Sequence, residues 1–273
     1  MIQLKRIAFK DENAFTLNVN NYNEESAHKL LLTVINNAKI VYEIIAGAYK
    51  AEWTNNPSVG VRTVLGLWLV TAARHFEAAI VLCMQGDLYI VSDVHLRQII
   101  ELYLQARYFA SLEKLQMEKE ADNIYVIACI EYLEKLQMLK DHESIKDEYR
   151  KILDKVSQYD KVIIEKIYKD RKKSKNWFGM TYSNLAQYFS EPGENLVGIY
   201  KVTSTDVHGS WDILFGVRSP EPGIIEFRSY KDKTTKDLQA AERLFTTTGY
   251  YINAWNQIAK VIGAEEVYYS HRS

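Results

Sequence analysis

The sequence has few cysteines and few prolines, and both shortages limit the possible folds. Among 273 residues only Cys83 and Cys129 are cysteines, and each lies in an apolar stretch without a partner at metal-ligand spacing. This excludes a disulfide scaffold and a cysteine-based metal site. The four prolines, at 57, 192, 220 and 222, lie outside the periodic stretches of the chain. Long helices are therefore expected to form without interruption.

The sequence also lacks an excess of charge of either sign. Lys and Arg number 34, Asp and Glu number 35, and the formal net charge is -1. This excludes a protein built mainly to coat nucleic acid or anionic membrane, so a nucleic acid would have to bind a local patch. The first residues contain no run suited to a signal peptide, and no stretch of about eighteen apolar residues is free of charge. We expect a cytoplasmic protein with no membrane segment.

Apolar residues make up 47% of the chain and recur at spacings of three and four, which is the period of an amphipathic helix. The pattern predicts an all-α fold with a central antiparallel helical hairpin. We expect an N-terminal extension at 1–23, followed by a single-domain helical bundle at 24–273. The expected helices span 24–50, 59–84, 89–112, 118–140, 142–172, 194–215 and 235–262, and a short helix is expected to end at Pro192-Gly193.

Several local signals refine this prediction. Asn56 followed by Pro57 resembles an N-cap with proline in the first turn, and the apolar run that follows has too few polar residues for a surface helix, so we expect this helix to be central. Thr234 and Asp237 resemble a capping box for the last helix. The segment RSPEPGIIEFRSY contains prolines and a glycine, so we expect a loop with one short extended piece.

Two Arg/Glu pairs lie on helices that are otherwise apolar. Arg74 and Glu77 are three residues apart, and Arg97 and Glu101 are four apart, so each pair shares one helix face. Gly86, where the hairpin turns, lies twelve residues after Arg74 and eleven before Arg97. We therefore expect one cluster of four charges between the helices. It is either a closed network of crossed ion pairs, or a site where an Arg or a Glu stays available for an anion or a proton.

The densest polar segment is IYKVTSTDVHGSWDILF. On a helix, Tyr200, Ser204 and His208 recur every four residues, and we expect their shared face to turn towards the second or third helix. A hydroxyl beside an imidazole can fix the tautomer of a His that moves a proton. No GxSxG motif is present, which argues against a serine hydrolase. His208 and Asp212 alone make a weak metal site, so we expect no metal and no cofactor.

A basic run precedes this segment and leads into Trp177. Such a run can hold a nucleic-acid backbone with an aromatic ring alongside. The same cations also suit a solvated helix C-terminus, where the helix dipole favours positive charge. Both interpretations remain open. The run consists of Lys169, Arg171, Lys172, Lys173 and Lys175.

Together, the charged hairpin, the segment NWFGMTYSNLAQYF and the motif Y-x3-S-x3-H-G-S resemble an uncharacterised bacterial helical family, a domain of unknown function, over roughly 60–255. Such proteins look distantly similar to HEPN helical bundles. Several HEPN proteins are metal-independent ribonucleases of toxin and phage-defence systems that act as dimers, with an Arg, four to six residues, and then a His. Here no Arg stands at that distance before His208, and the nearest upstream basic residue is Lys201, seven positions earlier.

The resemblance implies a dimeric effector that binds or cleaves RNA without a metal, with a protein partner such as an antitoxin. His208 would be the general acid/base, Ser204 would position it, and Arg97 or Arg74 would stabilise charge on phosphorus. His75 and His95 are weaker candidates for proton transfer. The expected binding residues are Glu77, Glu101, Tyr200, Trp177 and Lys201.

A second interpretation requires no catalysis. In it, the chain is a helical scaffold or regulator that binds a protein or a small ligand between the hairpin and the His208 helix. The sequence leaves open whether the protein is an enzyme.

Overall fold

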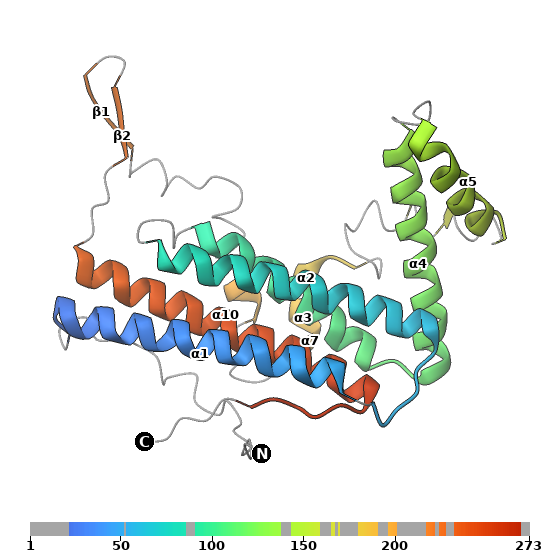
Figure 1. Ribbon diagram of the computed structural model, residues 1–273, viewed down its shortest axis with the longest axis horizontal. Helices are drawn as coiled ribbons and strands as arrows, with labels where there is room; N and C mark the ends of the chain where they lie inside the picture. Colours follow the sequence, from blue (N-terminus) through green and yellow to red (C-terminus); the bar gives the residue numbers. More distant parts are fainter. Residues whose placement is uncertain are drawn as a thin grey trace.

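The computed structural model is an all-α helical bundle, as predicted (Figure 1). It describes residues 22–51, 53–85, 91–137, 143–158, 165–166, 169, 180–190, 196–200, 217–221, 224–227 and 232–268. The helices are α1 (Glu24–Lys50), α2 (Val59–Met84), α3 (Ser92–Ala110), α4 (Lys114–Gln137), α5 (Glu143–Ser157), α7 (Tyr182–Phe189) and α10 (Lys233–Ile262), and residues 196–200 are also helical. The predicted extended piece is an antiparallel hairpin of β1 (Val217–Glu221) and β2 (Ile224–Phe227).

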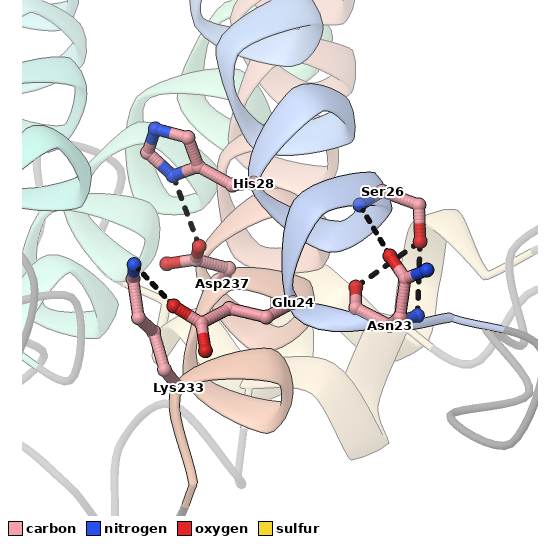
Figure 2. Close-up of polar contacts among 6 residues, drawn as sticks. All are labelled: Asn23, Glu24, Ser26, His28, Lys233 and Asp237. Carbon is pink, nitrogen blue, oxygen red and sulfur yellow. Dashed lines mark hydrogen bonds and ion pairs between the residues drawn. The ribbon is translucent and has the colours of Figure 1, made fainter.

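Helices α1 and α10 lie side by side and run in the same direction (Figure 1). At their N-terminal ends, Lys233 Nζ donates to Glu24 Oε1 at 2.6 Å, and His28 Nδ1 lies 3.0 Å from Asp237 Oδ2. Figure 2 shows both pairs bridging the two helices. Each pair joins residues separated by 209 positions, so the two helices keep one constant register.

The C-terminal end of α10 is fixed against the segment that links α1 to α2. Gly263 is the C-cap, with a left-handed φ of 68°. Thr54 Oγ1 donates to the Gly263 carbonyl at 2.7 Å, and the Asn55 N–H donates to the Ile262 carbonyl at 3.1 Å. A Cβ at Gly263 would collide with the Thr54 side chain and lie 2.8 Å from Asn55 N. Only glycine fits here, because of both the backbone conformation and the close approach.

The core lies where α1, α2, α3 and α10 face one another, and α2 and α3 form the predicted antiparallel hairpin (Figure 1). Phe76 of α2 stacks on Tyr251 of α10 with ring centroids 4.3 Å apart. Trp68 of α2 packs edge-on against Phe109 of α3 at 5.4 Å. Helices α4 and α5 form a second hairpin that projects from one end of the bundle (Figure 1). Helices α2, α3 and α10 therefore each pack against the other two.

Most helix bounds lie within four residues of the sequence prediction, but α5 ends at Ser157 and not at 172, and the predicted caps are wrong. Helices α1 and α2 span the expected 24–50 and 59–84. Ser58, not Asn56, caps α2, because its hydroxyl is the one that reaches the Val61 N–H. Asp232 caps α10 by accepting from the Thr235 N–H at 2.9 Å. The first turn of α10 thus begins two residues earlier than expected. The predicted division at residue 24 stays a prediction, since residues 1–21 lie outside the described part.

Helix α2 packs in the core, as expected of a central helix, but one of its faces is exposed, which the sequence did not predict. One face packs in the core, while the opposite face is exposed over most of the helix. Helices α1 and α2 are each long and apolar enough to cross a membrane by length and composition. Core helices of globular proteins pass the same test, so this is weak evidence for a membrane. The exposed face of α2 still requires an explanation.

Candidate functional site

A triangle of polar side chains joins α3 to the helical segment 196–200. Arg97 Nε donates to Glu101 Oε1 at 2.9 Å, and Arg97 Nη2 donates to the Tyr200 hydroxyl at 3.1 Å. The Tyr200 hydroxyl donates in turn to Glu101 Oε1 at 3.2 Å. The side chains of Arg97 and Glu101 are only 14% and 11% exposed. The predicted pair of Arg97 and Glu101 on one face of α3 therefore forms. Tyr200, from a distant part of the chain, completes the triangle.

Local packing explains why Tyr200 reaches this pair. Leu196, four residues before Tyr200, is fully buried and belongs to the core cluster. Residues one turn apart on a helix share a face, so burial of Leu196 turns the Tyr200 ring towards α3. The Arg97 guanidinium lies 5.2 Å from the centre of that ring. Tyr200 therefore turns towards α3, whereas Ser204 and His208, which were predicted to share its face, lie outside the described residues.

Burial and charge act in opposite directions within the triangle. Burial raises the pKa of Glu101, and the hydrogen bonds and charge of Arg97 oppose this rise. Burial also raises the pKa of Tyr200, and the Glu101 carboxylate adds to it. For Arg97, burial alone would lower the pKa, but the contacts with Glu101 and Tyr200 outweigh it and the pKa is raised. The triangle therefore holds a charged guanidinium in one orientation beside a protonated phenol.

A second tyrosine extends this polar row along α3. Gln105 lies one turn after Glu101, and its Nε2 donates to the Tyr182 hydroxyl of α7 at 2.8 Å. The rings of Tyr182 and Tyr200 are 6.1 Å apart. Within the described part of the chain, the buried Gln105 Oε1 has no hydrogen-bond partner. Polar side chains at every fourth position of α3 thus face two tyrosines from separate elements.

Two histidines connect α2 to α3 across the hairpin. His75 Nδ1 and His95 Nδ1 are 2.9 Å apart, so one ring must donate its proton to the other. Burial lowers the pKa of both, and for His75 the neighbouring His95 lowers it further. Both residues were expected to be only weaker candidates for proton transfer. Their nearly equal distances from Gly86 were the signal that could have paired them.

An ion pair between α3 and α10 was missed at the sequence level. Arg243 Nε lies 2.8 and 2.9 Å from the two carboxylate oxygens of Asp93, whose side chain is 7% exposed. Asp93 is in the first turn of α3, where a carboxylate is also favoured by the helix dipole. Both helices carry several charged residues, so charge alone did not indicate this pair. Nothing in the sequence showed that these helices touch.

The predicted cluster of four hairpin charges does not form. Arg74 and Glu77 are exposed, and neither has an ion pair or hydrogen bond with the described residues. Glu101 pairs with Arg97 of its own helix, not with Arg74. Similar distances from Gly86 place two residues at the same height along the hairpin, but they do not determine how α2 is rotated about its own axis. In the structure His75, and not Arg74, faces α3.

The remaining predicted site residues, and all of the basic run except Lys169, fall outside the part of the chain that the structure describes. The basic run is represented by Lys169, which is exposed and lies 3.7 Å from Glu165. Across the described ranges, no three His, Cys, Asp or Glu side chains gather as a metal site would require. Trp177, Lys201, Ser204, His208 and Asp212 lie outside the described residues.

Comparison with known proteins identifies a family but no characterised relative. The model of the Family of unknown function (DUF5677) matches residues 62–223, which include the α2–α3 hairpin, α7 and the segment that follows Tyr200. No curated protein and no solved structure matches the chain. Because the matched residues make up more than half of the sequence, the chain belongs to this family of unknown function.

Proposed function

We propose that the protein is a HEPN-like bacterial effector of phage-defence or toxin type that binds and cleaves RNA without a metal ion. The observation that carries the proposal is the contact of Tyr200 with Arg97 and Glu101. This contact holds Tyr200, where the polar segment leading to His208 begins, against Arg97, which is largely buried. An arginine oriented in this way suits a phosphate group better than a flexible lysine does.

The proposed reaction needs two groups. His208 takes the proton of the RNA 2′-hydroxyl while this oxygen attacks phosphorus, and the 5′-oxygen leaves with a proton from solvent. Arg97 stabilises the negative charge that develops on the phosphoryl oxygens. Glu101 and Tyr200 orient the guanidinium from two sides, at 2.9 and 3.1 Å. His208 itself lies outside the described residues, so its role rests on the sequence.

No Arg stands before His208 at the HEPN spacing, but another basic residue does. Six residues separate Lys201 from His208, which is the upper end of the four-to-six range. Lysine there supplies a positive charge but not the planar fork of an arginine. Lys201 directly follows Tyr200 in the sequence. We assign Lys201 to RNA binding.

One observation favours the alternative of a non-enzymatic scaffold or regulator. Arg97, Glu101 and Tyr200 satisfy one another, as residues of a purely structural network do. In that case the triangle fixes the docking of segment 196–200 on α3, and the protein acts by binding another protein or a small ligand. The two functions make opposite predictions for catalysis.

The test uses the full chain and four proteins: the wild type, His208→Gln, Arg97→Lys and Arg150→Lys. Arg150 is the matched control because it lies on α5 and its side chain is 73% exposed. Each is expressed in a bacterial host, and growth is followed. Each purified protein is then incubated with labelled RNA in the presence of a chelator, and thermal melting confirms that the variants are folded.

We expect the wild type and Arg150→Lys to inhibit growth and to cleave RNA in the chelator. His208→Gln should melt like the wild type and be inactive, and Arg97→Lys should be weaker. Full activity of His208→Gln, or loss of activity with the chelator, would overturn the mechanism. If the wild type neither binds nor cleaves RNA, the scaffold or regulator function replaces the proposed one.

A further inference from the structure

The outward face of α2 carries a regular stripe that is mostly apolar. Its positions follow one another at spacings of three and four residues, which keeps them on one side of the helix. The four apolar members are each 46 to 53% exposed. The two charged members, at its centre, are exposed as well. This α2 stripe consists of Leu67, Val70, Arg74, Glu77, Val81 and Met84.

The stripe is unusual for a solvent-facing surface. Single exposed apolar residues are normal, but a contiguous row marks an interaction site. From Leu67 to Met84 the row is about 26 Å long at the rise of an α-helix. The outward face of α1 has only Leu32 and Ile40 as large exposed apolar residues. The difference indicates that α2, and not its neighbour, has an unfilled contact.

The sequence of the stripe is symmetric about its centre. Arg74 and Glu77 lie in the middle, and Val70 and Val81 each lie four residues outside them. Leu67 and Met84 complete the stripe, three residues further out on each side. The stripe therefore presents the same order of apolar and charged positions when it is reversed, except that Arg and Glu exchange places.

This symmetry selects one partner and one orientation. We propose that the α2 stripe docks against the α2 stripe of a second copy of this chain, antiparallel, with a two-fold axis between Arg74 and Glu77. Arg74 then faces the partner's Glu77, and Glu77 faces the partner's Arg74. Val70 packs on the partner's Val81. A parallel pairing would place like charges opposite each other and is disfavoured.

Residues beside the stripe allow the helices to approach closely. Thr71, Ala73 and Ala78 flank it, are partly exposed and have small side chains. Two-fold contact of one patch with itself is the commonest arrangement of dimers. The resemblance to HEPN bundles leads us to expect a dimer but indicates no surface. The inference rests on the α2 stripe and is independent of the proposed RNA cleavage.

A lipid bilayer is the rival occupant, since α2 is apolar enough to span one. Arg74 and Glu77 argue against it, because they would enter the hydrocarbon at the centre of the stripe without partners, which is costly. The opposite face of α2 is already buried in the core, with Phe76 against Tyr251. A second copy neutralises both charges, whereas lipid neutralises neither.

The test is a charge exchange followed by sedimentation equilibrium of the full chain. Arg74→Glu alone replaces two attractive contacts with two repulsive ones, and Glu77→Arg alone does the same. Each should raise the dimer Kd at least about tenfold, which corresponds to about 1.4 kcal/mol. The double exchange should restore the dimer. A mixture of the two single variants should form a mixed dimer, because each carboxylate then faces a guanidinium.

Two apolar variants complete the design. Val70→Asp should weaken the dimer, whereas Ile40→Asp on α1, a residue 55% exposed, is the matched control and should not. Circular dichroism checks folding. A wild type that sediments as a monomer throughout, or single variants whose Kd is unchanged, would overturn the proposal. Failure of the double exchange would overturn the antiparallel register, and binding of the wild type to anionic lipid vesicles without dimers would favour lipid.

Discussion

Removal of the Glu101 side chain tests whether the α3 triangle stabilises the fold. Glu101→Ala leaves Arg97, whose side chain is only 14% exposed, without its carboxylate partner. Breaking a buried ion pair on one side costs about 3 to 5 kcal/mol. Arg97 keeps its bond to the Tyr200 hydroxyl and a small exposed surface, so the lower end of that range applies. We expect a loss of about 3 kcal/mol in the free energy of unfolding.

The assay is urea unfolding followed by circular dichroism at neutral pH, with a second variant as control. Arg97→Met combined with Glu101→Leu removes both charges and keeps apolar volume, so it should recover most of the loss. A double-mutant cycle of Arg97→Met, Glu101→Leu and the two combined measures the coupling. A loss below about 0.5 kcal/mol in Glu101→Ala would refute the reasoning, because that is the range of ordinary surface substitutions.

Three further predictions concern contacts between helices. Asp93→Ala should lower the free energy of unfolding by about 2 kcal/mol, since Arg243 loses both carboxylate contacts but is partly solvated; urea unfolding measures this. Burial lowers the pKa of His75 and His95, so their contribution to stability is present above the unfolded pKa of about 6.5 and is lost as pH falls through the folded values. His95→Gln should therefore show a smaller drop in stability between neutral and mildly acidic pH, and an equal drop would contradict this cause. Gly263→Ala should lower the melting temperature by several degrees, because φ is 68° and the added Cβ meets the neighbouring segment; an unchanged melt would show that the cap tolerates a side chain.

The sequence predicted the boundaries of α1 and α2 well because local signals determine them. Apolar periodicity sets the length of a helix, and a polar cap such as Asn23 marks where it begins. Such signals act over a few residues and need no knowledge of distant parts. They fail by a residue or two when several polar residues compete for one cap, as at Asp232.

The candidate site was only half predictable, and α2 shows why. This helix is apolar on nearly every side, so its sequence does not define which face is inward. The expected meeting of Arg74 with Glu101 failed for this reason. The partnership of Arg97 and Glu101 was predictable from a spacing of four residues on one helix. Tyr200 could be assigned a face but not a partner, because its contact spans 103 positions from Arg97.

The two Arg/Glu pairs have different expected roles. The pair on α3 stabilises the fold of one chain, and the pair on α2 stabilises the proposed dimer. The pair on α3 is satisfied inside one chain by Tyr200, so its loss should lower stability equally at every protein concentration. The pair on α2 has no contact in the described chain, and in the proposed dimer only a second copy satisfies it. Glu77→Arg should then lower stability only at concentrations where the wild type is dimeric, because association stabilises the folded state by mass action. Unfolding curves of Glu101→Ala and Glu77→Arg over a range of protein concentrations distinguish the two cases. A concentration dependence in both, or in neither, would mean that the pairs do not have these separate roles.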